Sequence, residues 1–347
     1  MDSTFLRIQS IRQSPDRFLG QGTYGCVYKT KLKCTNKRNK KLKNINNNAL
    51  SKIYIDEKHA SRELEISKQI TQIPHYDRHF SPLLDSCEAS LAQLNQNDID
   101  KCDLIEASTS TSTSTSSTPY FTTITKYIRG KTLSTYLEEY QKTTTKDKFE
   151  NKVFYIYTCL KDSIELLNAN GIIHFDLSER NIIMDTTDRP IIIDYGMSID
   201  TRKVATPEQY NHEFAHYSFM KDNNVDFYEP WCAEIIILMY LNQTLSPNEI
   251  INETHVEEMI RLSDQYSEHV RRALNTPSPT TPSMHQQTKY KSFIAKSAFE
   301  CSQELMKTYP TWDIYAISLM CLKYLPTVAT TPRKQEILDA IKGTILQ

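Results

Sequence analysis

Residues 171–181 decide the fold, and they read Gly-Ile-Ile-His-Phe-Asp-Leu-Ser-Glu-Arg-Asn. A second stretch, residues 191–196, reads Ile-Ile-Ile-Asp-Tyr-Gly. Short apolar runs between polar turn residues predict buried strands, here at 182–184 and 191–193. Asp176, Asn181 and Asp194 would then each lie beside such a strand. Two carboxylates and an amide in that placement suit a magnesium ion and a proton acceptor.

The chain has only seven glycines, and three of them lie within residues 20–25. Residues 20–27 read Gly-Gln-Gly-Thr-Tyr-Gly-Cys-Val, which fits G-x-G-x-x-G-x-V. In a dinucleotide-binding fold this motif leads from a strand into a helix. Here a strand-like sequence continues through residue 33, so a hairpin that covers nucleotide phosphates is the better match. An ordinary tight hairpin turn remains the alternative.

In this order and spacing the motifs resemble those of the protein kinase superfamily. Residues 174–181 match the H-R-D-L-x-x-x-N catalytic loop, and residues 194–196 match D-F-G. Asp176 precedes Asn181 by five positions and Asp194 by eighteen, as in that family. The composition, rich in Lys, Asn and Ile, is similar to that of divergent Ser/Thr protein kinases of large DNA viruses.

The resemblance implies a role for each matching residue. Asp176 would orient the substrate hydroxyl and accept its proton, while Asn181 and Asp194 would hold Mg²⁺. Residues of the glycine-rich loop would bind the phosphates of ATP; they are Gly20, Gln21, Gly22, Thr23, Tyr24, Gly25 and Val27. His174 is expected to pack rather than react. Lys126 and Ile128 would contribute backbone groups to the adenine site.

Lys52 stands where the family has its strand lysine, and it would bind phosphate. Its partner should lie on the following helix, where Glu63 and Glu65 both qualify by position. We favour Glu63 because it shares a helix face with the apolar residues at positions 60, 66 and 70. A solvated surface lysine is the alternative for Lys52.

Besides Tyr195, which stands where the family usually has Phe, three positions depart from the family pattern. Phe175 replaces the arginine that reads a phosphorylated activation loop, so activity is not expected to need that phosphate. Ser178 replaces the catalytic-loop lysine of Ser/Thr kinases, and Arg180 could supply the missing charge. Leu50 replaces the small alanine above the adenine ring.

The C-terminal part of the chain is expected to differ from the usual kinase arrangement, with an inserted helical segment and a shortened end. Asp313, in a stretch similar to D-x-W-S-x-G, would bind the backbone of the catalytic loop. Glu234 would replace the A-P-E glutamate with Arg333 as its partner, and Glu208 is a rival for that place. Residues 235–241 form the longest apolar run and are far too few to span a bilayer.

The sequence predicts an α+β, bilobal kinase-like fold. Residues 1–127 would form the β-rich N-terminal lobe, with a basic loop at 31–48 and a disordered Ser/Thr loop at 107–118. The basic loop is either a solvated inter-strand loop or a phosphate-binding or localisation patch. Residues 128–347 would form the helical lobe, with an inserted segment at about 240–308. Helices are expected at 59–70 and 148–168, and a strand at 120–127.

The bulk composition excludes several classes of protein. The net charge of −1 gives no field that favours nucleic acid, and no secretory signal opens the chain. None of the eight cysteines forms a C-x-x-C pair, which favours reduced thiols and a cytoplasmic location, or the host cytoplasm for a viral protein. A disulfide framework is the alternative.

The combined prediction is an ATP- and Mg²⁺-dependent protein kinase that acts on Ser/Thr of protein substrates. A tyrosine or dual-specificity kinase is one alternative. A pseudokinase that binds ATP and partners without catalysis is the other.

Overall fold

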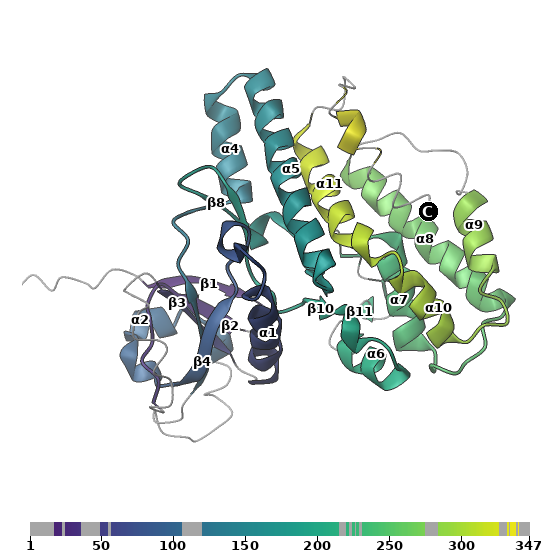
Figure 1. The fold of residues 1–347 in the computed structure, drawn as a ribbon, viewed down its shortest axis with the longest axis horizontal. Coiled ribbons are helices and arrows are strands. Elements are labelled where there is room, and N and C mark those ends of the chain that lie inside the picture. Colours follow the sequence, from purple (N-terminus) through teal and green to yellow (C-terminus); the bar gives the residue numbers. More distant parts are fainter. Residues whose placement is uncertain are drawn as a thin grey trace, which may run out of the picture. The chain divides into compact units, whose positions relative to one another are not determined.

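The structure is a computed structural model. It describes residues 17–22, 25–35, 49–54, 57–105, 120–214, 220–221, 224–225, 227–228, 231–274, 284–325, 332, 334–337 and 339. The chain divides into two compact units, which are described separately below (Figure 1). Unit 1 comprises residues 1–64 and 83–127, and unit 2 comprises residues 65–82 and 128–347.

Unit 1 is built on an antiparallel sheet with the strand order β1-β2-β3-β5-β4. The strands are β1 (Phe18–Gly22), β2 (Gly25–Tyr28), β3 (Ala49–Tyr54), β4 (Leu83–Ala89) and β5 (Tyr120–Lys126). Helix α1 (Glu57–Ile70) follows β3 directly, and the short α2 (Gln96–Ile99) lies between β4 and β5. The expected strand at 120–127 and the expected helix at 59–70 are thus confirmed. The basic loop from residue 36 to 48 and the Ser/Thr loop lie outside the described residues.

The glycine-rich motif forms the two strands of a hairpin. β1 pairs with β2 in antiparallel register, with Gly22 opposite Gly25. The motif leads into strand β2 and not into a helix, which excludes the dinucleotide-binding interpretation. A Cβ atom on Gly25 would lie 2.1 Å from the carbonyl oxygen of Ile53 on β3. Gly25 is therefore required by the close approach of a neighbouring strand, whatever the loop binds.

Two disulfides cross-link unit 1 and correct the prediction that the cysteines are reduced. Cys26 on β2 is bonded to Cys102, and Cys34 is bonded to Cys87 on β4. The partners are 76 and 53 residues apart, so no local spacing motif could reveal them. Disulfides are typical of oxidising compartments, so cysteine usage no longer favours the cytoplasm.

The disulfides predict a simple thiol count. In denaturant without a reductant, four cysteines should react with a thiol reagent: Cys159, Cys232, Cys301 and Cys321. After reduction all eight should react. Mass spectrometry of the alkylated protein measures both states. Eight reactive thiols before reduction would restore the prediction of reduced cysteines.

Unit 2 is mainly helical. Its central helix α5 (Lys146–Ala169) confirms the helix expected at 148–168, and it packs beside α11 (Trp312–Tyr324) (Figure 1). The other helices are α4 (Leu133–Thr143), α6 (Pro207–Phe214), α7 (Ala233–Thr244), α8 (Glu253–Ala273), α9 (Met284–Lys291) and α10 (Ala298–Met306). Short strands complete it: β6 (Gly130–Thr132), β7 (Ile172–Ile173), β8 (Ile182–Asp185), β9 (Pro190–Ile192), β10 (Ile199–Asp200), β11 (Met220–Lys221) and β12 (Asn224–Val225).

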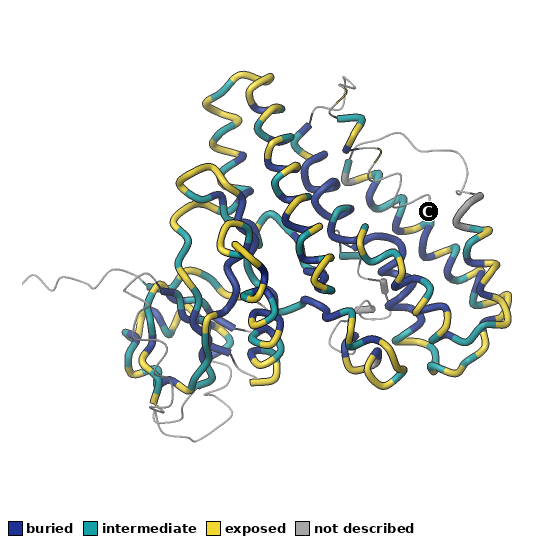
Figure 2. Tube along the Cα trace, viewed as in Figure 1, coloured by how far each residue is buried: buried dark blue, intermediate teal, exposed yellow. Residues whose placement is uncertain are grey.

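Helix α7 carries the longest apolar run and lies in the core of unit 2. All residues from Ala233 to Leu241 are buried, and α7 contacts α6, α8 and α10 (Figure 2). A helix that is apolar on every side needs neighbours on every side. The helices α8, α9 and α10 of the expected inserted segment supply many of them. Among the described helices, none is long and apolar enough to cross a membrane.

Candidate active site

Lys52 and Glu63 form an ion pair inside unit 1. The Lys52 Nζ atom lies 3.4 Å from Glu63 Oε2, and the two side chains are 12 % and 3 % exposed. Val27 on β2 stands directly opposite Lys52 on β3. The hydroxyl of Tyr54 donates a second hydrogen bond to the same Glu63 oxygen, a contact that the sequence did not reveal. The pair is therefore buried and specific, so Lys52 is not a solvated surface lysine.

The rival Glu65 faces elsewhere and provides a matched control. It pairs with Lys203 at 2.6 Å, and both side chains are largely exposed. Replacing Glu63 by glutamine should lower kcat/KM for ATP by about ten- to hundredfold, since a charged hydrogen bond contributes about 1.5–3 kcal/mol. Glu65→Gln should stay close to wild type, because exposed pairs contribute little. Steady-state kinetics on both variants measures the difference, and equal losses would contradict the choice of Glu63.

The other residues expected to contact ATP belong to the glycine-rich loop and to the end of β5. A Cβ on Gly20 would meet no atom within 4 Å, and one on Gly22 would lie 3.9 Å from the Gly25 carbonyl oxygen, an ordinary contact. The Gln21 side chain is engaged within unit 1, because its Oε1 atom accepts a hydrogen bond from the Asp103 backbone at 2.9 Å. Lys126 ends β5 opposite Ala49, and Ile128 begins the next segment of unit 2. Thr23 and Tyr24 lie outside the described residues.

Asp176 and Asn181 form a fixed pair in unit 2. The Asn181 Nδ2 atom donates to Asp176 Oδ2 at 2.9 Å and to the Asp176 carbonyl at 2.8 Å. Burial raises the pKa of Asp176, and the Tyr228 hydroxyl, His174 and Asn181 act in the opposite direction. The turn Glu179–Asn181 is a 3₁₀ helix that carries Arg180 on its exposed side.

The donor set near Asp176 fits a magnesium ion. Because Asn181 Nδ2 is used by Asp176, the amide oxygen of Asn181 is the atom left to act as a ligand. Asp194 is half-buried, and after burial its charge is the other cause that raises the pKa of Asp176. One amide oxygen and one carboxylate suit Mg²⁺, which keeps water and phosphate oxygens as its other ligands.

Asp313 at the start of α11 binds the catalytic-loop backbone. Its carboxylate accepts from the backbone N–H of His174 at 2.7 Å and of Phe175 at 3.0 Å. Phe175 has a φ of 68°, and an aromatic residue in this left-handed region is strained. His174 is fully buried, with Nε2 3.0 Å from the Ile193 carbonyl. The geometry agrees with a packing role for His174.

An aromatic cluster surrounds Phe175, where the family has arginine. The rings of Trp231, Phe214 and Trp312 lie 5.0, 6.0 and 6.3 Å from the Phe175 ring. Trp231 Nε1 also donates to the Phe175 carbonyl at 2.9 Å. Apolar packing and this hydrogen bond therefore join residue 231 to the catalytic loop.

Tyr228 is a site residue that sequence reasoning missed. Its hydroxyl donates a hydrogen bond to Asp176 Oδ1. Burial and the Asp176 charge raise the pKa of Tyr228, so its phenol stays protonated and can donate. No motif surrounds Tyr228, and the contact spans 52 residues.

Glu234 pairs with a lysine that the sequence did not suggest. Glu234 is 4 % exposed, and its Oε1 atom lies 3.3 Å from Lys289 Nζ on α9. The expected partner Arg333 lies outside the described residues. Glu208 is exposed on α6, which leaves Glu234 as the better match to a buried structural glutamate.

A family model described as "Protein kinase domain" matches residues 14–296. The chain therefore belongs to the protein kinase family, and its α+β class is confirmed. A search of curated proteins found no match.

Proposed function

We propose that the protein transfers the γ-phosphoryl group of ATP to Ser/Thr hydroxyls of protein substrates. The observation that carries this proposal is the Asp176 carboxylate, held by Asn181 and already bonded to a hydroxyl, that of Tyr228. A substrate hydroxyl would take the same place on Asp176 Oδ1. Asp176 would orient that hydroxyl and accept its proton as the new O–P bond forms.

The residues proposed to bind the phosphates of ATP and Mg²⁺ are assigned by their charge and their position in the motifs. Lys52, fixed by Glu63, would bind phosphate oxygens, and the backbone of residues 20–25 would donate N–H groups to them. Asn181 and Asp194 would hold Mg²⁺, which neutralises phosphate charge when bound. Arg180 is exposed beside Asp176 in the catalytic loop and would supply the positive charge that Ser178 lacks.

The test is transfer of label from radioactive ATP to mixed protein substrates. Wild type should label them, whereas Asp176→Ala and Lys52→Met should not. Equal labelling by all three proteins would end the proposal, and absence of labelling by wild type would favour a pseudokinase. Phosphoamino-acid analysis of the product identifies the acceptor.

A tyrosine or dual-specificity kinase has one observation in its favour. The phenol of Tyr228 reaches Asp176, so a hydroxyl at the end of a tyrosine side chain can occupy this position. Phosphotyrosine in the product would select this second candidate. The viral resemblance and a cytoplasmic location stay predictions, and the resemblance rests on composition and on the expected rebuilding of the C-terminal lobe.

Activity is expected to survive treatment with a phosphatase. The segment at Trp231 is held by packing against Phe175 and by its hydrogen bond to the Phe175 carbonyl. No arginine stands at position 175 to read a phosphate. Initial rates before and after phosphatase treatment, with the phosphatase removed, should agree. A loss of activity that returns on rephosphorylation would contradict this prediction.

A further inference from the structure

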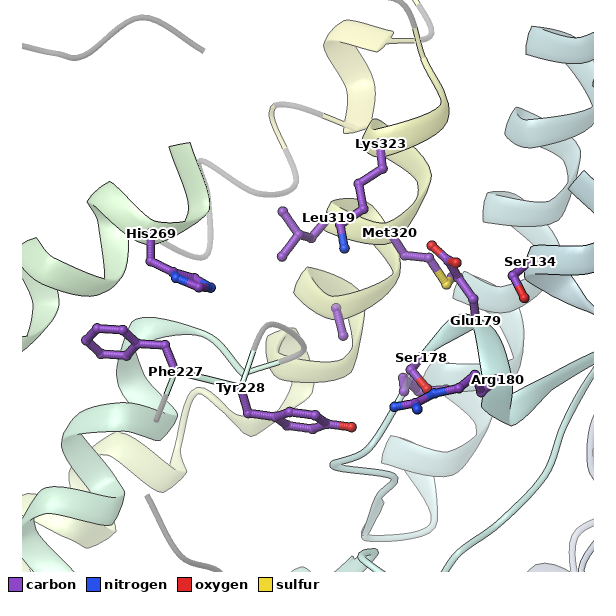
Figure 3. Close-up of a pocket in the computed structure, with 12 residues that line it drawn as sticks. Ser134, Ser178, Glu179, Arg180, Phe227, Tyr228, His269, Leu319, Met320 and Lys323 are labelled. Carbon is purple, nitrogen blue, oxygen red and sulfur yellow. The ribbon is translucent and has the colours of Figure 1, made fainter. Parts of the chain in front are cut away.

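A cavity of about 550 Å³ opens in unit 2 beside the catalytic loop (Figure 3). One wall is the loop itself at residues 177–180, and a second is formed by Phe227 and Tyr228. Further walls come from His269 on α8, from residues 316–323 on α11 and from Ser134 on α4. Helix α8 lies within the segment at about 240–308 that the sequence predicts to be an insertion.

The cavity continues directly from Asp176. Tyr228 lines it and, at the same time, donates its hydroxyl to Asp176 Oδ1. Figure 3 shows Tyr228 and Arg180 pointing toward one another at its inner end. A protein segment whose hydroxyl replaced that of Tyr228 on Asp176 would therefore place its neighbouring residues in this cavity.

The lining carries more positive than negative groups. Arg180 and Lys323 contribute cations, and His269 contributes an ionisable ring. The His269 Nε2 atom is buried and has no hydrogen-bond partner among the described residues. The carboxylate in the lining is Glu179, and it already accepts a hydrogen bond from the Tyr324 hydroxyl at 2.9 Å.

The basic side chains of the lining come from three separate elements. Arg180 lies on the catalytic loop, His269 on α8 and Lys323 on α11, and Figure 3 shows the last two pointing into the space between those helices. A carboxylate placed there would gain charge-assisted hydrogen bonds, whereas a lysine or arginine would meet like charge.

We propose that this cavity binds the residues next to the acceptor hydroxyl of a protein substrate and selects acidic side chains there. This inference rests on the proposed kinase activity. On this proposal, His269 on helix α8 contributes to the choice of substrate.

The test uses three peptides of equal length that differ only beside a single acceptor hydroxyl. The neighbouring residues are all glutamate, all glutamine or all lysine. Wild type should prefer glutamate to lysine by about tenfold or more in kcat/KM, with glutamine between them. For a peptide that is not phosphorylated, the inhibition constant against a protein substrate is measured instead. The glutamate peptide should then bind most tightly and the lysine peptide least tightly.

Charge reversal identifies the residues responsible. Lys323→Glu and His269→Glu should each reduce the preference for glutamate, and the double variant should favour lysine. Lys307→Glu, at an exposed position after α10, is the matched control and should behave as wild type. KM for ATP and the thermal unfolding of each variant show whether the fold is intact.

Each outcome separates the two proposals. Equal use of the three peptides, or a preference for lysine, by a wild type that phosphorylates proteins would overturn the acidic selection alone. A preference for glutamate that both reversals leave unchanged would also overturn it, because the selection would then lie elsewhere. Absence of phosphorylation of any peptide or protein would overturn the kinase activity itself.

Discussion

Replacing Asp176 by asparagine is expected to lower kcat by about 10²–10⁴-fold, the usual contribution of general acid–base catalysis. Asparagine has nearly the same shape as aspartate and can still accept a hydrogen bond from a hydroxyl. It cannot accept the proton that leaves the substrate oxygen. The variant should therefore bind ATP and protein substrates as wild type does and fail in the transfer step.

Three measurements make this prediction specific. Single-turnover kinetics reports the transfer step, a titration reports ATP affinity, and thermal unfolding reports the fold. Asp77→Asn is the matched control, because Asp77 is exposed on a turn of the same unit. Transfer by Asp176→Asn at the rate of this control would show that Asp176 is not the proton acceptor.

Replacing Asp313 by alanine is expected to have the second-largest effect. The backbone N–H groups of His174 and Phe175 would lose their shared acceptor while remaining buried. Each unsatisfied donor costs about 1–3 kcal/mol, so the free energy of unfolding should fall by about 2–5 kcal/mol. Part of this loss is offset, because the variant no longer pays the desolvation cost of a buried carboxylate. The same desolvation raises the pKa of Asp313.

The same substitution should also reduce activity. Asp313 holds Phe175 in its strained backbone conformation, and Asp176 is the next residue. Urea unfolding and kcat are measured on Asp313→Ala, on Asp313→Asn and on the control Asp162→Ala, which is exposed on α5. Asparagine keeps one acceptor oxygen and should give intermediate values. A stability equal to that of the control would contradict the role of Asp313 as the acceptor for both N–H groups.

Aromatic packing joins the catalytic loop to the segment at residue 231. An arginine before Asp176 would need an anion to hold the segment at residue 231, whereas Phe175 contacts Trp231 directly. Tyr266 on α8 adds a second anchor, since its hydroxyl donates to the Trp231 carbonyl. Helices α8 and α9 therefore hold the part of the chain that carries Trp231 and Glu234, through Tyr266 and Lys289.

Much of the candidate site could be predicted from short contiguous stretches. The motif at 171–181 contains both Asp176 and Asn181, which are five residues apart, so their contact follows from local geometry. The choice of Glu63 over Glu65 followed from helix periodicity, and the ion pair with Lys52 agrees with it. Asp313 was expected to bind the catalytic-loop backbone because of its motif, and its two hydrogen bonds match that expectation.

The sequence by itself determined the α+β class, the membership of the kinase family and the motif residues, because these features are encoded over a few neighbouring positions. Only the tertiary structure decided the disulfide Cys26–Cys102, the Glu234–Lys289 ion pair and the contact of Tyr228 with Asp176. These partners lie more than fifty residues apart, and no periodicity or spacing links them. Such contacts depend on how helices and strands pack, and packing is a property of the whole folded chain.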